Sequence, residues 1–500
     1  MDVFERDALE VLSLVRSIKN SFAPINWIPP EILSLAPDYY DEDIDRHLIT
    51  LTHVCRSWRN AFISRSSLWT RLDFTNVDKT RTYLRRSKSS PLELYLERNK
   101  SSTYLNNAFF LAAPHIHRLK SLTIHGDVLP DAIRHFYCHA PRLEKLDINL
   151  SCLRAPAFDS ALFKGDLSSL RELSLVGVVR SLPWNGLANL TTFKLKSSIP
   201  GLCSVTRLLN FFECAPLPHT ITLVDSTPTS SNAPAGRIVS LPRLNALYII
   251  ARPPHSILLN HLRIPTGASL VLRLSFSGGK SPLQYHLPET STNLKNLSRI
   301  TTINLCFSAS QKNVRLSGPS GELYVIAGWE DETVTPRTMD HRILRSLSPS
   351  ILLTTQRLAI SGYKPPKPDK VEKCPVFRTL SSMHNLRTLI LTKCHNLPFI
   401  LALNPEKNPS ELVLCPNLDE LVLYVKSRDQ FHIKRLLNMT EERGSRGVRL
   451  SSITIVGLDE LVPGKEVFKL REHVARVDYR VDDVPPHWDV LPCESSDENE

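Results

Sequence analysis

The sequence predicts an α/β chain in which a helical N-terminal region is followed by a long, irregular solenoid. Three observations lead to this prediction. At 500 residues the chain is too long for one ordinary core. Its 36 prolines against 17 glycines divide it into many short elements, because proline fits neither helix interiors nor central strands. From about residue 90 onward, a triplet of apolar residues at i, i+3 and i+5 returns repeatedly.

Residues 1–22 are predicted to form an amphipathic N-terminal helix. Their apolar residues recur mostly at the helical spacings of three and four, at Ala8, Val11, Leu12, Val15, Ile18 and Phe22. Pro24 ends the helix, and the acidic residues near its start do not fit a signal peptide. Two interpretations stay open: the helix binds a partner, or it packs on the domain that follows.

Residues 23–75 are predicted to form a helical domain. A short helix opens at 28–33, where prolines precede an acidic first turn. The acidic stretch 38–43 connects it to a helix that is predicted to run from His47 to Ser64 without interruption. The apolar face of this helix holds Leu48, Leu51, Val54, Cys55, Trp58 and Phe62. A short strand begins at Leu72.

The apolar triplets predict one irregular solenoid over residues 76–490. The last two positions of a triplet are two residues apart, so they point to one face of a short strand, and stacked units then share a core. The copies are Leu119, Leu122, Ile124; Leu143, Leu146, Ile148; Leu170, Leu173, Leu175; Leu190, Phe193, Leu195; Leu244, Leu247, Ile249; Ile300, Ile303, Leu305; Leu386, Leu389, Leu391; Leu418, Leu421, Leu423; Leu450, Ile453, Ile455; and Val474, Val477, Tyr479. Between about 260 and 380 only the Ile300 copy stands out. Residues 491–500 are predicted to be an acidic, disordered tail.

Composition limits the expected partners and compartment. The formal net charge of +11 is spread thinly, and the densest basic clusters, 85–88 and 364–367, are short, which predicts no nucleic-acid partner. No apolar run approaches the roughly 18 residues that span a membrane, which predicts no membrane partner. The 10 cysteines lack C-x-x-C spacing, which is typical of reduced thiols in an intracellular protein of the cytoplasm or nucleus.

The sequence predicts no catalytic residue, no bound metal and no cofactor. It contains no phosphate-binding loop, nucleophile elbow, H-E-x-x-H or kinase motif. Cys394 and His395 adjoin, but neighbours in a strand point to opposite faces. Two histidine pairs lack a complete set of metal ligands: His115 with His117, and His135 with His139 beside Cys138. An enzyme on an unrecognised fold remains one alternative.

Three stretches of the N-terminal region resemble the F-box. Ile28 to Leu33 is similar to its L-P-x-E-I-L opening, Leu51 to Arg59 to its second helix, and Ser67 to Trp69 to its close. The stretch 78–92 resembles the segment directly after the F-box in many proteins of mushroom-forming fungi, and the triplets are similar, less closely, to leucine-rich repeats. The expected fold class is therefore α/β, with an N-terminal helical F-box at 23–75 followed by an irregular leucine-rich-repeat-like solenoid.

The resemblance implies a substrate-receptor subunit of a Skp–cullin–F-box ubiquitin ligase. The F-box would bind a Skp-type adaptor, which bridges to a cullin, and the repeats would bind a protein substrate. The alternative is a non-catalytic protein-interaction scaffold without a ligase role. The residues expected to contact the adaptor are Pro29, Pro30, Ile32, Leu33, Leu51, Val54, Cys55, Trp58, Leu68 and Trp69. Trp58 and Trp69 could instead only hold the F-box against the repeats.

The sequence does not single out substrate-binding residues. The expected substrate surface is the strand face opposite the core, because alternate strand residues point away from it. The outward positions carry mixed charges and are Thr123, Lys145, Asp147, Glu172, Thr388 and Glu420. They indicate a polar binding surface for a protein of unknown identity.

Overall fold

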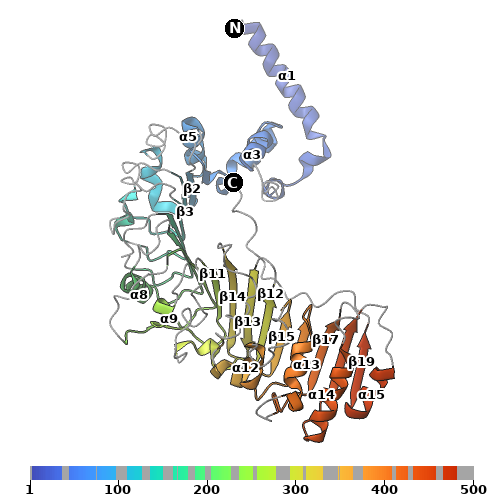
Figure 1. Cartoon of the computed structure of the whole chain (residues 1–500). Coiled ribbons are helices and arrows are strands. Elements are labelled where there is room, and N and C mark those ends of the chain that lie inside the picture. Colours follow the sequence, from blue (N-terminus) through green and yellow to red (C-terminus); the bar gives the residue numbers. More distant parts are fainter. Residues whose placement is uncertain are drawn as a thin grey trace. The chain divides into compact units, whose positions relative to one another are not determined.

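The computed structural model describes the chain in segments (Figure 1). They are residues 3–35, 44–74, 76–96, 110–126, 136–149, 162–165, 167–177, 186–197, 204–226, 236–251, 256–276, 293–307, 311–329, 347, 349–363, 375–407, 413–425, 432–457 and 465–480. The chain divides into two compact units, Met1–Ile199 with Glu213–Ala215, and Pro200–Phe212 with Pro216–Glu500. This division falls inside the region predicted as one array. The acidic stretch 38–43 and the tail 491–500 lie outside the described segments.

The first unit begins with helices. The predicted N-terminal helix is α1, Val3–Ser21. The other helices and turns of this unit are η1 (Pro24–Trp27), α2 (Pro30–Leu33), α3 (Ile44–Thr52), α4 (Arg56–Ser64), η3 (Ser66–Trp69), α5 (Val77–Arg86), η4 (Ala113–Arg118) and η6 (Leu162–Gly165). Asn76 caps α5, because its side-chain oxygen accepts hydrogen bonds from the backbone nitrogens of Asp78 and Lys79.

The prediction of one continuous helix from His47 to Ser64 is wrong. The chain leaves the helical conformation at residues 53–55, between α3 and α4, and Cys55 is extended. Arg59 stabilises the break, because its Nε atom donates a hydrogen bond to the backbone oxygen of Thr52 at the end of α3 (3.0 Å). Val54 is therefore turned to solvent and does not continue an apolar helix face.

Six parallel strands follow one another in the described part of the first unit. They are β1 (Arg71–Leu72), β2 (Leu92–Leu96), β3 (Leu119–His125), β4 (Lys145–Asn149), β5 (Glu172–Gly177) and β6 (Thr192–Ser197). Each strand pairs with the next in a register that aligns the triplets. Leu122 pairs with Leu146, and Leu146 with Leu173. All three side chains are buried, as the triplet spacing predicts.

The second unit holds a larger, mostly parallel sheet (Figure 1). Its strands lie in the order β7, β9, β11, β14, β13, β12, β15, β16, β17, β18, β19. Their bounds are Thr220–Val224, Ala246–Ala251, Ser269–Phe276, Gly321–Trp329, Gln311–Gly318, Thr302–Phe307, Arg357–Ser361, Thr388–Thr392, Glu420–Val425, Ser452–Gly457 and Arg476–Arg480. Two short strands, β8 (Val239–Ser240) and β10 (Leu262–Arg263), pair separately.

Strands β13 and β14 form an antiparallel hairpin within this parallel sheet. The hairpin lies in the region where the triplet pattern is weakest, and no prediction covers it. Its turn depends on glycine. A Cβ atom on Gly318 would overlap the backbone oxygen of Arg299, and Gly321 has φ of 133°, which side chains rarely allow.

Helices alternate with the last strands of the second unit. The helices and turns of this unit are α8 (Val205–Cys214), α9 (Ser256–Leu259), η9 (Lys295–Leu297), α11 (Pro349–Thr354), α12 (Pro375–Ser381), α13 (Leu397–Leu403), η11 (Pro405–Lys407), α14 (Ile433–Ser445) and α15 (Lys465–His473). Phe399, Leu436 and Leu470 lie buried on α13, α14 and α15. The predicted α/β class and the N-terminal helix are confirmed, and the structure adds that the sheet is mostly parallel. None of the described helices has the length and apolar character to cross a membrane.

Candidate functional site

Four of the residues expected to contact an adaptor are exposed on the short helices of the first unit. Pro29 and Pro30 stand exposed at the start of α2. Ile32 on α2 is 57% exposed, and Val54 between α3 and α4 is 53% exposed. Both α2 and α3 contact α4, so these residues belong to one group of packed helices. Exposed apolar side chains grouped in this way are typical of a protein-binding surface.

Trp58 is partly buried and is fixed by its own domain. Its indole Nε1 donates a hydrogen bond to the side-chain oxygen of Asn26 (2.6 Å), and its ring meets the Phe62 ring edge-on at 6.0 Å between centroids. Cys55 Sγ lies 3.8 Å from the same Asn26 oxygen. The indole is thus held in one orientation while part of it stays accessible. The other partly buried members of the expected set are Leu51, Cys55 and Leu68.

Leu33 and Trp69 do not fit the expected adaptor surface, because both are buried. Trp69 is 0% exposed. Its Nε1 donates to the backbone oxygen of Phe62 (2.9 Å), its ring meets Tyr83 edge-on at 4.9 Å, and the Arg86 guanidinium stacks 4.3 Å from its centroid. A residue that uses its hydrogen-bond donor and its ring for internal contacts is a core residue. Trp69 therefore has the supporting role that was the alternative interpretation.

Four further apolar residues of this region are exposed and were not predicted. They are Ile25 and Trp27 on η1, Leu35 after α2, and Ile49 on α3. Ile49 follows the buried Leu48, and successive helix residues are turned by about 100°, so one can be core and the next surface. The sequence could have indicated such exposure, because an apolar residue outside the apolar face of its helix is expected at the surface.

In the first unit, three of the outward strand residues expected to bind substrate form ion pairs within the sheet. Lys145 Nζ lies 3.2 Å from the Glu172 carboxylate, and His125 Nε2 lies 3.6 Å from that of Asp147. Each pair joins neighbouring strands, where opposite charges stabilise the sheet surface modestly. Thr123 is partly buried beside them. Much of the mixed charge on this face is therefore matched within the sheet.

In the second unit, part of the strand face opposite the core is not exposed. Ala359 of β15 and Ile390 of β16 occupy outward positions, yet both are buried. Polar groups stay accessible where the chain enters the strands. There, Thr388 donates a hydrogen bond from its hydroxyl to the Glu420 carboxylate (3.1 Å). The accessible polar residues of this face therefore lie at the entering ends of these strands and not at the centres of β15 and β16.

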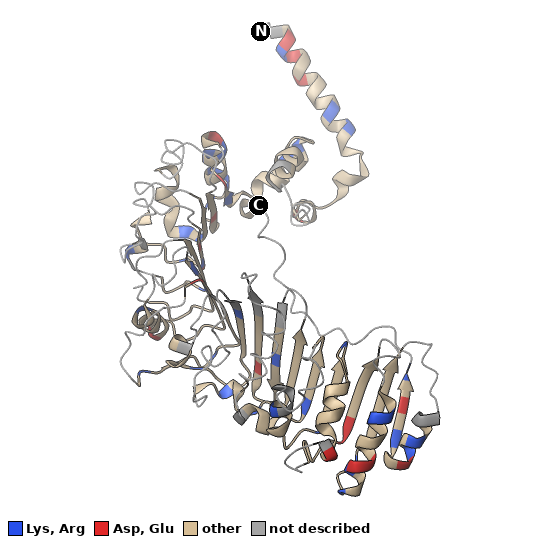
Figure 2. Ribbon diagram, viewed as in Figure 1, with Lys and Arg blue, Asp and Glu red and all other residues tan. Residues whose placement is uncertain are grey.

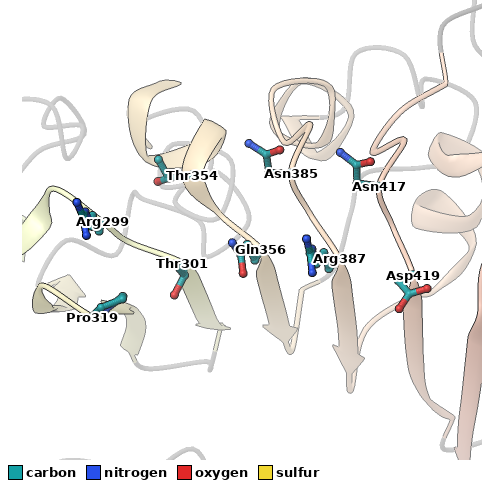
Figure 3. Close-up of a pocket in the computed structure, with 9 residues that line it drawn as sticks. All are labelled: Arg299, Thr301, Pro319, Thr354, Gln356, Asn385, Arg387, Asn417 and Asp419. Carbon is teal, nitrogen blue, oxygen red and sulfur yellow. The ribbon is translucent and has the colours of Figure 1, made fainter.

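A polar hollow of about 620 Å³ lies at these entering ends (Figure 3). It is lined by Arg299, Thr301, Pro319, Thr354, Gln356, Asn385, Arg387, Asn417 and Asp419. Pro319 comes from the β13–β14 turn, and the others precede β12, β15, β16 and β17. The hollow was not predicted, although a sequence signal exists. Arg299, Asn385 and Asn417 each stand immediately before the first apolar residue of a triplet.

Backbone hydrogen bonds set four of these side chains in one row. The oxygen of Thr301 accepts from the nitrogen of Gln356 (2.8 Å). The Gln356 oxygen accepts from Arg387 (2.7 Å), and the Arg387 oxygen from Asp419 (2.8 Å). Because neighbouring strands lie about 4.8 Å apart, the row offers one polar side chain at each strand interval. An extended polypeptide crossing the strands would meet them in turn.

The asparagines of the hollow repeat one arrangement. Asn385 Nδ2 donates to the backbone oxygen of Leu353 (2.7 Å), and Asn417 Nδ2 donates to that of His384 (2.9 Å). Their side-chain oxygens remain as acceptors for a ligand. Arg387 has no ion pair or side-chain hydrogen bond to any residue that the structure describes, and the same holds for Arg299, so both guanidinium groups can donate. The lining is therefore equipped to bind a polar segment.

The cysteine and histidine positions noted in the sequence do not come together as a site in the described segments. Burial raises the pKa of the Cys394 thiol to about 12, and the adjoining His395 is exposed. His135 lies outside the described residues, so its pairing with His139 is not described. Across the segments that the structure describes, no three metal-ligating side chains gather closely enough to hold an ion.

Comparison with known proteins adds no family to these findings. No protein-family model matches the chain, and no curated protein matches it. The structure defines a mixed α/β protein with an N-terminal helix and a mostly parallel sheet. The F-box resemblance rests on residues of the 28–69 region alone.

Proposed function

We propose that the chain is the substrate-receptor subunit of a Skp–cullin–F-box ubiquitin ligase of the cytoplasm or nucleus. The observation that carries this proposal is the exposed apolar surface of α2–α4, in the region that resembles an F-box. Ile32, Ile49 and Val54 are its main members. Burying them against a Skp-type adaptor, which bridges to a cullin, would remove apolar area from water, and such burial drives association.

The repeats would form an irregular leucine-rich-repeat-like solenoid that holds a protein substrate. The strand register supports this, because equivalent triplet residues pair along the second unit: Leu389 with Leu421, and Leu421 with Ile453. Stacking of one short unit on the next is the usual construction of repeat proteins. The polar hollow is the proposed substrate site, and Arg299 and Arg387 are its principal donors.

This proposal assigns no chemical step to the chain. A receptor acts by raising the effective concentration of its substrate near the enzyme that carries ubiquitin. Hydrogen-bond donors and acceptors in the hollow are sufficient for that task. Neither a cofactor nor a metal is part of the proposal.

Adaptor capture by the full chain tests the ligase proposal. Purified Skp-type adaptor should bind the wild-type chain, and Ile32→Asp combined with Val54→Asp should weaken binding by at least about tenfold, or 1.4 kcal/mol. Ile238→Asp, at an exposed isoleucine of the second unit, is the matched control and should bind normally. Failure of the wild-type chain to bind, or equal binding by the double variant, would overturn the proposal.

Proteomics after gene deletion separates a receptor from a scaffold. A receptor should leave at least one protein accumulating, and a chain carrying Arg299→Glu and Arg387→Glu should fail to reverse the accumulation. If the adaptor binds but no protein accumulates, the non-catalytic scaffold is the better account.

A further inference from the structure

The N-terminal helix α1 turns its polar side, and not its apolar side, toward the rest of the first unit. Among its residues of described exposure, only Ser13 and Ser17 are partly buried. The Ser13 hydroxyl accepts a hydrogen bond from Arg56 Nη2 of α4 (2.5 Å), and the backbone oxygen of Asn20 accepts one from Asn26 Nδ2 (2.6 Å). The interpretation in which α1 packs by its apolar face on the following domain does not fit this arrangement.

The apolar residues of α1 are left on the surface. Seven large ones, exposed by 44% to 82%, are Phe4, Leu9, Val11, Leu12, Leu14, Val15 and Ile18. A narrower set forms one seam, at alternating spacings of four and three, namely Phe4, Ala8, Val11, Val15 and Ile18. This is the heptad spacing of a coiled coil, in which the seam residues of one helix fit between those of another. The helix therefore carries a seam for a second helix.

We propose that α1 pairs with α1 of a second copy of this chain in an antiparallel coiled coil. In an antiparallel pair centred at residue 13, four of the five seam residues of each helix face one another, and Phe4 lies beyond the overlap. That register sets Val11 against Val15 of the second copy and Ala8 against Ile18 of the second copy. Leu12 and Leu14 flank the centre and would widen the buried area. Ser13 faces Arg56 of its own chain, so the two contacts do not compete.

The charges on α1 select the antiparallel orientation. Glu5 lies in its first turn and Lys19 in its last. Figure 2 shows the acidic residues near the N-terminus of α1 and basic residues further along. In the antiparallel register, Glu5 lies near Lys19 of the second copy. A parallel pair would bring the two acidic ends together, and its aligned helix dipoles would also repel.

The same charges disfavour a membrane surface as the occupant of the seam. Val3–Ser21 contains three acidic residues and three basic ones, so its net charge is zero. Helices that lie on anionic bilayers usually carry a basic polar face. A second α1, with the same mixed charges in reverse order, is the complementary partner.

Pairing of α1 would make the proposed receptor a dimer. Two adaptor surfaces and two polar hollows would be joined in one assembly, and linked sites bind a multivalent partner more tightly than either site alone. The pairing itself does not require that the adaptor proposal hold. Because the seam is short, the association should be weak and concentration-dependent.

Sedimentation equilibrium of the full chain tests the pairing. The measured mass should rise from one chain toward two as concentration increases. Val15→Asp combined with Ile18→Asp should raise the dissociation constant at least about tenfold. Asn20→Asp changes the polar side of the same helix and should leave the mass unchanged. Circular dichroism of each variant checks the fold, and these positions are exposed, so folding should persist.

Charge reversal tests the orientation. Glu5→Lys alone and Lys19→Glu alone should each weaken the dimer, and the two together should restore it. A single-chain mass for the wild type at all concentrations would overturn the proposal. So would a failure of the double reversal to restore pairing. If Val15→Asp with Ile18→Asp instead abolishes adaptor capture, or binding to phosphatidylserine vesicles, by a chain that is always monomeric, the seam belongs to that other partner.

Discussion

The indole Nε1 of Trp58 donates a hydrogen bond to the side-chain oxygen of Asn26, 2.6 Å away and 32 residues earlier in the chain. This bond joins α4 to the turn that comes after α1. It also fixes the orientation of the Trp58 indole, which is partly exposed on the proposed adaptor surface. Trp58 thus has two properties to consider, its observed support of the fold and its proposed contact with an adaptor.

Trp58→Phe should separate these two properties. Phenylalanine keeps an aromatic surface for the adaptor but removes the donor, so unfolding free energy should fall by about 1 kcal/mol while adaptor affinity changes little. Trp58→Ala should lose both. Thermal or urea unfolding of Trp58→Phe, Asn26→Ala and the double variant gives the coupling between the residues. Strictly additive losses would show that the hydrogen bond contributes nothing.

Arg443 of α14 carries a second prediction. Its guanidinium is buried and donates to the backbone oxygens of Leu414 and Cys415, each at 2.9 Å. Arg443→Met leaves both oxygens without this partner, and the unfolding free energy should fall by about 3 kcal/mol. Arg443→Lys should not recover it, because an ammonium group lacks the fork that reaches both oxygens. The exposed Arg435→Met is the control, and an equal loss there would refute the account.

The strands of the repeats were predictable because each triplet places two apolar residues on one face of a short strand. Three segments that this pattern did not identify show where it fails. Trp69, Leu72 and Phe74 have the same i, i+3, i+5 spacing and are all buried. The F-box resemblance assigned Trp69 to the end of the helical region, so its place as the first residue of the triplet that enters β1 was missed. The triplet spacing correctly indicates that these three residues are buried, whereas the predicted boundary at residue 75 separates them from the repeats.

Strand β15 was missed for a different reason. Its triplet is Thr355, Leu358 and Ile360, with a polar residue in the first position. Thr355 is fully buried, and its hydroxyl donates to the backbone oxygen of Ile351 (2.8 Å). A hydroxyl with a hydrogen-bond partner fits a core position, but a pattern of apolar residues does not include it. The hollow depends on several such strand-entering segments, so its assembly could not be predicted from triplets alone.

The antiparallel hairpin β13–β14 had signals of another kind. Val314 and Leu316 alternate with polar residues, and Gly318 to Gly321 form a glycine-rich turn. These are the marks of a hairpin with period two. They do not have the i, i+3, i+5 spacing of the repeats, so the triplet pattern does not include them.

Thiol reactivity should distinguish the buried Cys394 and Cys415 from the exposed Cys214 of α8. Burial raises the pKa of Cys394 and of Cys415 to about 12, so at pH 8 only about one thiol in 10,000 is ionised. Cys214 on α8 is exposed. Iodoacetamide should therefore label Cys214 quickly and the other two only after unfolding, as read by peptide mass spectrometry. Rapid labelling of Cys394 in the native protein would contradict its burial.

Acid should destabilise the second unit through His432. Burial lowers the pKa of His432 below its ordinary value of 6.5, and nearby His395 and Arg435 lower it further. Below about pH 6.5 the unfolded chain therefore binds more protons at this residue than the folded chain, and stability falls as pH falls. His432→Gln should flatten the dependence of unfolding free energy on pH between about 7.5 and 5.5. An unchanged slope would show that other groups cause it.

Gly318 should be indispensable to the edge of the polar hollow. A Cβ atom there would overlap the backbone oxygen of Arg299, which is part of the hollow, so the β13–β14 turn would have to move. Gly318→Ala should lower unfolding free energy by about 2 kcal/mol or more, because neither backbone can give way cheaply. It should also weaken substrate capture in the proposed receptor, since Arg299 would shift with its backbone.

Gly444 on α14 is the matched control for this change. A Cβ atom there would meet only the side chain of Arg449, at an ordinary 3.4 Å. Because alanine favours a helix over glycine, Gly444→Ala should raise unfolding free energy by up to about 1 kcal/mol and leave substrate capture intact. Urea unfolding of both variants measures the two changes in unfolding free energy. Opposite signs support a turn packed on Arg299, whereas a neutral Gly318→Ala would mean that the hairpin does not approach Arg299 as described.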